Sequence, residues 1–221
     1  MTHRDPSAAG PLAFFGGTFD PVHYGHLRCA DEARQKLGLK NLYLLPAGTP
    51  PHRDAPQASV KQRLDMLELA RKEFPHLLID DRETRRSGPS YMVDTLRELR
   101  SEFPDQPLLL LVGQDVANHL HRWFQWQRLF DLAHIVVLTR PASHTAYEGD
   151  LAKQVRLRSV SDFHELFKSR AGAVVHLEVE PIEVSATAIK SIIGSNKRPA
   201  SMLPAAVLEY IIENRLYLQE L

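Results

Sequence analysis

Two histidines three positions apart are the side chains in this sequence best placed to do chemistry. His23 and His26 flank Gly25, shortly after an apolar run that ends in Gly16-Gly17. Paired glycines let an anionic group come close to the backbone N–H donors, because no side chain intervenes. A helix that starts near Gly25 adds partial positive charge at its N-terminus. Together these features predict a polyphosphate site in which the two imidazoles stabilise charge during a reaction.

The residues alone leave other interpretations of this histidine pair open. Histidines at this spacing also occur on protein surfaces and in cores. No cysteine or carboxylate stands beside them at a usual zinc spacing, so we expect no protein-held metal. The sequence contains neither a Walker A motif nor Gly-x-Gly-x-x-Gly, and kinases and dehydrogenases therefore lose their usual support.

Short apolar runs alternate with helical segments along most of the chain. The runs predicted as strands are Leu12–Phe15, Asn41–Leu45, Leu77–Ile79, Leu108–Val112, His134–Thr139 and Val174–Val179. This alternation predicts an α/β fold, a Rossmann-like doubly wound domain with a mainly parallel sheet of about six strands and flanking helices. Ligands in such sheets bind beyond the carboxyl ends of the strands, so the residues after each run are the candidates for function.

The helical segments have recognisable starts and stops. We predict helices over 25–37, 59–74, 90–103, 185–193 and 204–214, and a less regular one near 161–169. Ser59 with Gln62 forms a capping-box pattern, Ser90 and Ser185 are expected N-caps, and Gly38 is a natural stop. Residues 1–11 are expected to be a flexible tail, and residues 12–221 a single domain whose C-terminal helical part, 185–221, packs on it.

Composition narrows the class of protein. Lys+Arg and Asp+Glu both number 27, and this balance argues against a nucleic-acid partner. The longest aliphatic run, Leu108–Val112, is too short to cross a membrane. The single cysteine, Cys29, favours a reducing compartment, so we expect a cytoplasmic protein with Cys29 as a small buried residue. Arg82, Arg85 and Arg86 are expected to form a solvated basic face. Homo-oligomerisation stays open.

The segment from Gly16 to His26 resembles the nucleotidyltransferase superfamily with the signature Gly-x-(Phe/Tyr)-Asp-Pro-x-His-x-Gly-His. Later segments are similar to the bacterial nicotinate-nucleotide adenylyltransferase family, and each follows a predicted strand or opens a predicted helix. They are Pro50-Pro51-His52-Arg53, Ser90-Tyr91-Met92-Val93-Asp94-Thr95, Gly113-Gln114-Asp115, Trp123-Phe124, Arg140-Pro141 and Ser185-Ala186-Thr187-Ala188-Ile189-Lys190. The chain departs from the family pattern at Arg53, Met92, Ala186 and Lys190.

The resemblance implies adenylyl transfer from ATP to nicotinate mononucleotide, which gives deamido-NAD and pyrophosphate, a step of NAD biosynthesis. It implies His23 and His26 as catalytic residues. The implied ATP-binding set adds Gly16, Gly17, Thr18, Phe19, Gly113, Asp115, Arg140, Ser185, Thr187 and Lys190. The implied acceptor-binding set is Ala47, Gly48, Thr49, His52, Arg53, Ser90, Tyr91, Met92, Trp123 and Phe124. Mg²⁺ would arrive with ATP, held mainly by phosphate oxygens.

Several alternatives stay open at this stage. The acceptor could be nicotinamide mononucleotide or pantetheine phosphate, or the chain could be a nucleotide-binding sensor of the same fold without activity. Trp123 and Phe124 could serve the core instead of stacking on a pyridine ring. If the acceptor carries a carboxylate, we expect backbone amides around Met92 and over Ala47–Thr49 to receive it.

Overall fold

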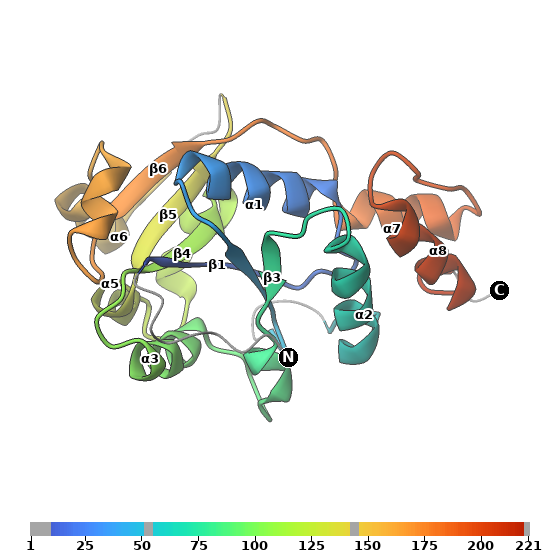
Figure 1. The fold of residues 1–221 in the computed structure, drawn as a ribbon, viewed down its shortest axis with the longest axis horizontal. Helices are drawn as coiled ribbons and strands as arrows, with labels where there is room; N and C mark the ends of the chain where they lie inside the picture. The colour runs from blue at the N-terminus through green and yellow to red at the C-terminus, as the bar shows by residue number, and fades with distance from the viewer. Residues whose placement is uncertain (1–9, 51–54, 142–145, 219–221) are drawn as a thin grey trace.

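A computed structural model of the protein describes residues 10–50, 55–141 and 146–218. In this part of the chain one sheet contains six strands, and every neighbouring pair is parallel (Figure 1). The strands are β1 (Leu12–Gly17), β2 (Leu42–Pro46), β3 (Leu77–Ile79), β4 (Leu108–Gly113), β5 (His134–Thr139) and β6 (Val174–Glu178). Their order is β3-β2-β1-β4-β5-β6. The order reverses between β1 and β4, which is where an open parallel sheet forms its ligand crevice.

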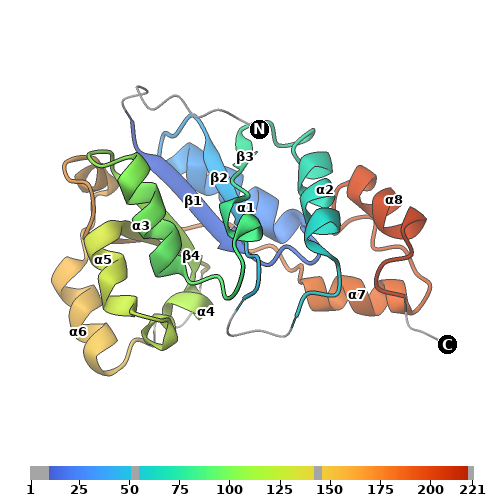
Figure 2. The same ribbon diagram turned by 90° about the horizontal axis from the view of Figure 1, so that it is seen from below.

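Alternation along the strands produces two cores, one on each face of the sheet. Leu109 and Leu111 of β4 face one core, while Leu108 and Leu110 face the other. The first core is covered by α1 (Tyr24–Lys36), α2 (Val60–Ala70), α7 (Ala186–Gly194) and α8 (Ala205–Glu213). The second core is covered by α3 (Met92–Glu102), α5 (Leu129–Leu132) and α6 (Gly149–Arg158). Figure 2 shows these two groups of helices on opposite sides of β1. The doubly wound prediction is confirmed.

Local sequence signals placed several element ends correctly. Ser59 and Gln62 form both hydrogen bonds of the capping box at the start of α2. Gly38 adopts a φ of 64° just after α1, which is the left-handed conformation that favours glycine. The Ser185 side chain accepts a hydrogen bond from the backbone N–H of Ala188 and caps α7.

Other element predictions were wrong. Helix α3 begins at Met92 with Tyr91 at the N-cap position, so Ser90 is not the cap. The segment near 161–169 holds only a 3₁₀ helix, η4 (Phe163–Phe167), and α6 was not predicted. Between β4 and β5 lie short turns of helix that left no clear pattern: α4 (Gln114–Ala117), η2 (Leu120–Arg122) and η3 (Trp126–Arg128), followed by α5. A further 3₁₀ helix, η1, spans Arg82–Arg85.

No helix in the described residues is both long enough and apolar enough to span a membrane.

Candidate active site

The loop after β1 is shaped by a close approach between Gly17 and Phe19. A Cβ atom on Gly17 would lie 2.8 Å from the Phe19 ring, closer than atoms in proteins approach. Phe19 itself has a φ of 51° and is 1% exposed, so its ring folds back under the loop into the core. Glycine at position 17 therefore leaves room for the Phe19 ring in this turn. The turn leaves the loop backbone at the carboxyl end of β1, beside the crevice between β1 and β4.

The two candidate histidines lie against each other at the start of α1. Their ring centroids are 3.7 Å apart and the planes are inclined by 25°. Gly25 makes this arrangement accessible, because a Cβ there would lie 2.9 Å from the His23 ring and 3.0 Å from the carbonyl oxygen of Val184. Phe19 contacts the other side of the pair, with its ring edge-on to His26 at a centroid distance of 5.0 Å. The structure thus brings His23 and His26 together as predicted.

Burial sets the charge of His23. Its side chain is buried, and loss of hydration lowers the pKa of His23 from 6.5 to about 4. Its Nδ1 atom has no hydrogen-bond partner among the described residues. His23 is therefore a neutral imidazole near pH 7, and its ring nitrogens can serve as hydrogen-bonding groups without carrying a full charge.

Two helix N-termini meet at this point. In the described part of the chain α1 carries no side-chain cap, and neither α1 nor α7 has an acidic residue in its first turn. The contact between Gly25 and the carbonyl oxygen of Val184 places the start of α7 directly beside the start of α1. The Ser185 and Thr187 side chains are exposed there. Converging helix N-termini without an acidic residue in either first turn favour an anionic ligand.

Lys190, the cation expected for phosphate, is engaged within the protein. Its ammonium group forms an ion pair with the carboxylate of Asp20, which is 7% exposed. Burial alone would raise the pKa of Asp20, but hydrogen bonds from Lys190, from Tyr217 and from the backbone N–H groups of Gln57 and Ala58 outweigh it and hold the pKa below its usual value. Lys190 is therefore held beside Asp20 in the loop after β1.

Arg63 is a buried charge that the sequence analysis missed. Its guanidinium donates hydrogen bonds to the carbonyl oxygens of Thr18 at 2.8 Å and Ala47 at 2.7 Å, and the side chain is 1% exposed. It therefore joins the loop after β1 to the loop after β2. Burial lowers the pKa of Arg63, the opposite effect coming from nearby Asp20. The available signal was a basic residue at position 63 on the apolar face of the helical pattern that contains Met66 and Leu67.

The loop after β2 lies beside the loop after β1 and is fixed to Ser90. The Ser90 hydroxyl accepts hydrogen bonds from the N–H groups of Gly48 at 3.1 Å and Thr49 at 3.2 Å, while Ala47 donates to the carbonyl oxygen of Gly17. The expectation that these three amides receive a ligand's carboxylate is therefore wrong for this structure, because all three already donate within the protein. Their role is to shape the loop.

The aromatic residues form a small platform near the start of α3. Phe124 is 47% exposed, and its ring lies on that of Tyr91 at a centroid distance of 4.6 Å. The Met92 side chain reaches to within 3.3 Å of where a Cβ on Gly16 would stand. Trp123 is partly buried against the second core. The start of α3 has no side-chain cap in the described residues, so its first amides are directed at this region.

The remaining predicted residues are spread around the same edge. Gly113 precedes α4, and Asp115 is exposed in the first turn of that helix. Arg140 follows β5 and lowers the pKa of Cys29, although burial is the larger influence and raises it. His52 and Arg53 lie outside the described residues.

The prediction that Arg82, Arg85 and Arg86 form a solvated basic face is wrong in part. The Arg82 side chain is only 10% exposed and is paired with Asp80 and Glu102. Arg86 is paired with Glu98. These arginines therefore anchor η1 to α3, with only Arg85 largely exposed.

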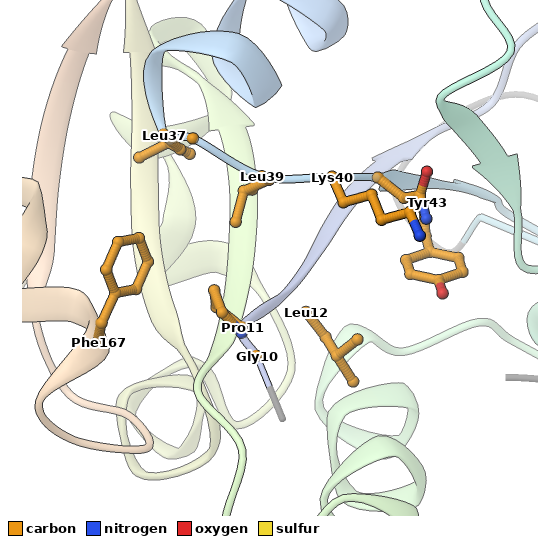
Figure 3. A pocket seen from close by; sticks show the side chains of 10 residues that line it. Gly10, Pro11, Leu12, Leu37, Leu39, Lys40, Tyr43 and Phe167 are labelled. Carbon is orange, nitrogen blue, oxygen red and sulfur yellow. The ribbon is translucent and has the colours of Figure 1, made fainter. Parts of the chain in front are cut away.

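A hollow at the opposite edge of the sheet is separate from this site. It lies where β1 and β2 begin, between Pro11, Leu37, Leu39 and Phe167, with Lys40 and Tyr43 at its other side (Figure 3). None of the predicted catalytic or binding residues lines it. The candidate active site is the carboxyl edge, where the histidine pair, the two helix starts and the aromatic platform lie.

Comparison with known proteins places this arrangement in a family. The cytidylyltransferase-like family model matches residues 14–192. A relative from Aeromonas hydrophila, named "Probable nicotinate-nucleotide adenylyltransferase", is 42% identical over 207 residues, which cover 94% of this chain and 97% of the relative. A relative of the same name from Methylococcus capsulatus is 45% identical and covers 93% of this chain and 99% of its own length.

Solved structures agree on the fold. The nicotinic acid mononucleotide adenylyltransferase of Plasmodium falciparum, in a structure described as complexed with NaAD, superposes with a TM-score of 0.72 at 13% identity and covers 94% of this chain and 97% of that one. At that identity the likeness concerns the fold alone. The sequence relatives carry the assignment, and the chain belongs to the nicotinate-nucleotide adenylyltransferase family of nucleotidyltransferases.

Proposed function

We propose that this protein transfers the adenylyl group of ATP to nicotinate mononucleotide, giving deamido-NAD and pyrophosphate, as a step of NAD biosynthesis. The observation that carries the proposal is the meeting of the α1 and α7 N-termini around the stacked His23–His26 pair. Membership of the nicotinate-nucleotide adenylyltransferase family supports the choice of both substrates. The single free thiol, Cys29, supports a reducing compartment, the cytoplasm, as the place of action.

ATP is assigned to the crevice between β1 and β4. His23 and His26 would donate to its phosphates, beside the backbone of the loop after β1. Ser185 and Thr187 at the α7 start, with Lys190 one turn further on, would hold the leaving pyrophosphate. The other members of the proposed ATP site are Gly16, Gly17, Thr18, Phe19, Gly113, Asp115 and Arg140. Mg²⁺ enters as part of the substrate MgATP, bound mainly by phosphate oxygens and water.

For this reaction the protein must align the two substrates and stabilise the negative charge that develops on the phosphates. The 5′-phosphate of nicotinate mononucleotide attacks the α-phosphorus of ATP in line, a new P–O bond forms, and the bond to the β-phosphate oxygen breaks to release pyrophosphate. The nucleophile is already an anion, so no strong general base is required. Neutral His23 and the helix N-termini stabilise the charge that builds up on the transferred and leaving groups.

The acceptor is assigned to the start of α3. Its pyridine ring would stack near Phe124, Tyr91 and Trp123, and its carboxylate would bind the amide of Met92 at the uncapped end of the helix. Ala47, Gly48, Thr49 and Ser90 would form the wall of this pocket, since their mutual hydrogen bonds hold it in shape. His52 and Arg53 belong to the same proposed acceptor segment.

The test is pyrophosphate release by the purified protein with MgATP and either nicotinate mononucleotide or nicotinamide mononucleotide at equal concentrations. A strong preference for the acid is the expected result. Preference for the amide would overturn the acceptor assignment while keeping the reaction type. Binding of ATP without pyrophosphate release from either acceptor, measured by calorimetry, would overturn the proposed activity.

A further inference from the structure

The carboxylate of Asp20 is a buried junction of three separate segments of the chain. Its Oδ1 atom accepts hydrogen bonds from the Ala58 N–H at 3.1 Å and from the Tyr217 hydroxyl at 2.7 Å. Its Oδ2 atom accepts from the Gln57 N–H at 3.0 Å and from the Lys190 ammonium. The donors come from the loop before α2, from α7 and from the segment that follows α8. Each oxygen therefore receives one backbone donor and one side-chain donor.

Tyr217 contacts Lys190 as well as Asp20. The Lys190 ammonium lies 5.0 Å from the centroid of the Tyr217 ring, within the range of a cation–π interaction. Burial and the neighbouring Asp20 carboxylate both raise the pKa of the Tyr217 hydroxyl, so it stays a donor over the whole working pH range. Tyr217 has a φ of 63°, a left-handed conformation that a non-glycine residue adopts at a cost. The C-terminal segment turns sharply at the point where this side chain meets the junction.

Lysine has a long flexible side chain, and it holds one direction only where its surroundings restrict it. Here Lys190 is restricted on two sides, by the Asp20 carboxylate and by the Tyr217 ring. Its charge is partly balanced by Asp20, but buried Arg63 lies close enough to affect both Asp20 and Tyr217 electrostatically. Arg63 thus adds a second positive charge in the neighbourhood of Asp20, under the loop after β1.

We propose that Tyr217 is a positioning residue for nucleotide binding. It acts through Asp20 to hold Lys190 near the start of α7, where the phosphates of ATP are assigned. The C-terminal segment after α8 thereby completes the ATP site without touching the ligand. This inference rests on the proposed function, because it takes Lys190 as a group that binds the phosphates of ATP.

The test is a double-mutant cycle of Tyr217→Phe and Lys190→Met, with the kinetics of both substrates measured for each variant. Tyr217→Phe keeps the ring and removes only the hydroxyl. We expect it to raise KM for MgATP about five- to tenfold, the effect of one weakened charge-assisted hydrogen bond, with KM for the acceptor unchanged. In the Lys190→Met background the same substitution should have almost no further effect, since the group that it positions is gone.

Tyr210→Phe is the matched control. Tyr210 is a second tyrosine of the C-terminal region, and its hydroxyl donates to Asp65 on α2, away from Asp20. A merely structural role for Tyr217 predicts equal effects of the two Tyr→Phe substitutions on the melting temperature and no selective change in KM for MgATP. Calorimetric titration with MgATP in the absence of acceptor gives a second readout, in which only Tyr217→Phe should weaken binding.

The outcomes separate the inference from the proposed function. Additive effects of Tyr217→Phe and Lys190→Met, or equal effects of the two Tyr→Phe variants on KM, would overturn the positioning role. A Lys190→Met variant with unchanged kinetics would overturn both the phosphate role of Lys190 and the inference, while turnover itself would still support adenylyl transfer. Absence of turnover in the unmodified protein would instead overturn the proposed function.

Discussion

The imidazole rings of His23 and His26 stack at a centroid distance of 3.7 Å at the start of α1, where His23 is the N-cap residue and no side-chain cap is formed in the described residues. Two imidazole rings can lie this close only if they are not both positively charged, because two charged rings would repel each other. Burial keeps His23 neutral by lowering its pKa to about 4. A neutral His23 can therefore lie against His26 where the loop after β1 meets α1.

Loss of one ring should reduce the rate of adenylyl transfer more than it reduces stability. We expect His26→Ala to lower kcat by about a hundredfold or more, because one preorganised donor to the developing charge is lost. The measurement is pyrophosphate release under saturating substrates. His76→Ala is the control, since His76 is exposed and directly precedes β3, at the amino end of the sheet. Near-normal turnover by His26→Ala would remove this residue from the mechanism.

The neutral state of His23 predicts a pH dependence of stability. Its pKa is about 4 in the folded protein and near 6.5 when unfolded, so the unfolded chain binds more protons between these values. Stability should therefore fall as the pH is lowered from 7 towards 4, with a contribution from His23 of about 3 kcal/mol at most. Burial lowers the pKa of His134 and His176 too, and these act in the same direction.

The contribution of His23 is isolated by comparison with a variant that cannot titrate. The free energy of unfolding of the natural protein and of His23→Gln would be measured by urea denaturation at pH 7, 5.5 and 4.5. The difference between the two proteins should change in favour of the variant as the pH falls. A difference that is constant with pH would show that His23 has an ordinary pKa.

Much of the fold follows from the sequence because it depends on short-range signals. Six apolar runs bounded by Gly, Pro or polar residues identify the strands, and the capping box of Ser59 identifies α2. The turn between β1 and α1 likewise depends on residues that lie close together in the sequence, Gly17, Phe19 and Gly25. The missed elements, α6 and the short helices after β4, lack both caps and clear periodicity. Tertiary packing on the second core holds them in place.

The parts of the site that were missed depend on contacts between distant residues. Ser90 has the sequence features of an N-cap, but its hydroxyl accepts hydrogen bonds from the N–H groups of Gly48 and Thr49, 42 and 41 residues away. Lys190 is predicted from the sequence as a phosphate-binding cation, but its ion pair with Asp20, 170 residues away, has no sign in the sequence. Arg63 stands out locally as a basic residue on an apolar helical face, but nothing near it in the sequence indicates the two loops that it joins. Long-range pairings of this kind cannot be obtained from spacing along one sequence.

The tight fit of Gly48 predicts that this position tolerates no side chain. A Cβ there would lie 2.3 Å from the carbonyl oxygen of Glu83 and 3.0 Å from the Ser90 hydroxyl. The obstacle is backbone, so Gly48→Ala must move η1 or the loop, at a cost of about 1–3 kcal/mol. We expect a lower melting temperature and a raised KM for the acceptor.

Gly113→Ala is the matched control for stability. Gly113 has open space around the position of a Cβ and a φ of −68°, so alanine fits its backbone without strain. Its melting temperature should stay within a few degrees of the natural protein. Equal melting temperatures of the two variants would contradict the contact between Gly48 and Glu83.

The aromatic platform predicts a selective effect on the acceptor. Phe124 is half exposed and lies on Tyr91, so it contributes little to the core, and Phe124→Ala should leave the melting temperature almost unchanged. Stacking of one aromatic pair is worth about 0.5–1.5 kcal/mol, so we expect KM for nicotinate mononucleotide to rise about three- to tenfold with KM for MgATP unchanged. Leu157→Ala removes another exposed apolar side chain, 73% exposed on α6, and should change neither KM. A rise in KM for MgATP instead would place the adenine ring, and not the pyridine, on this platform.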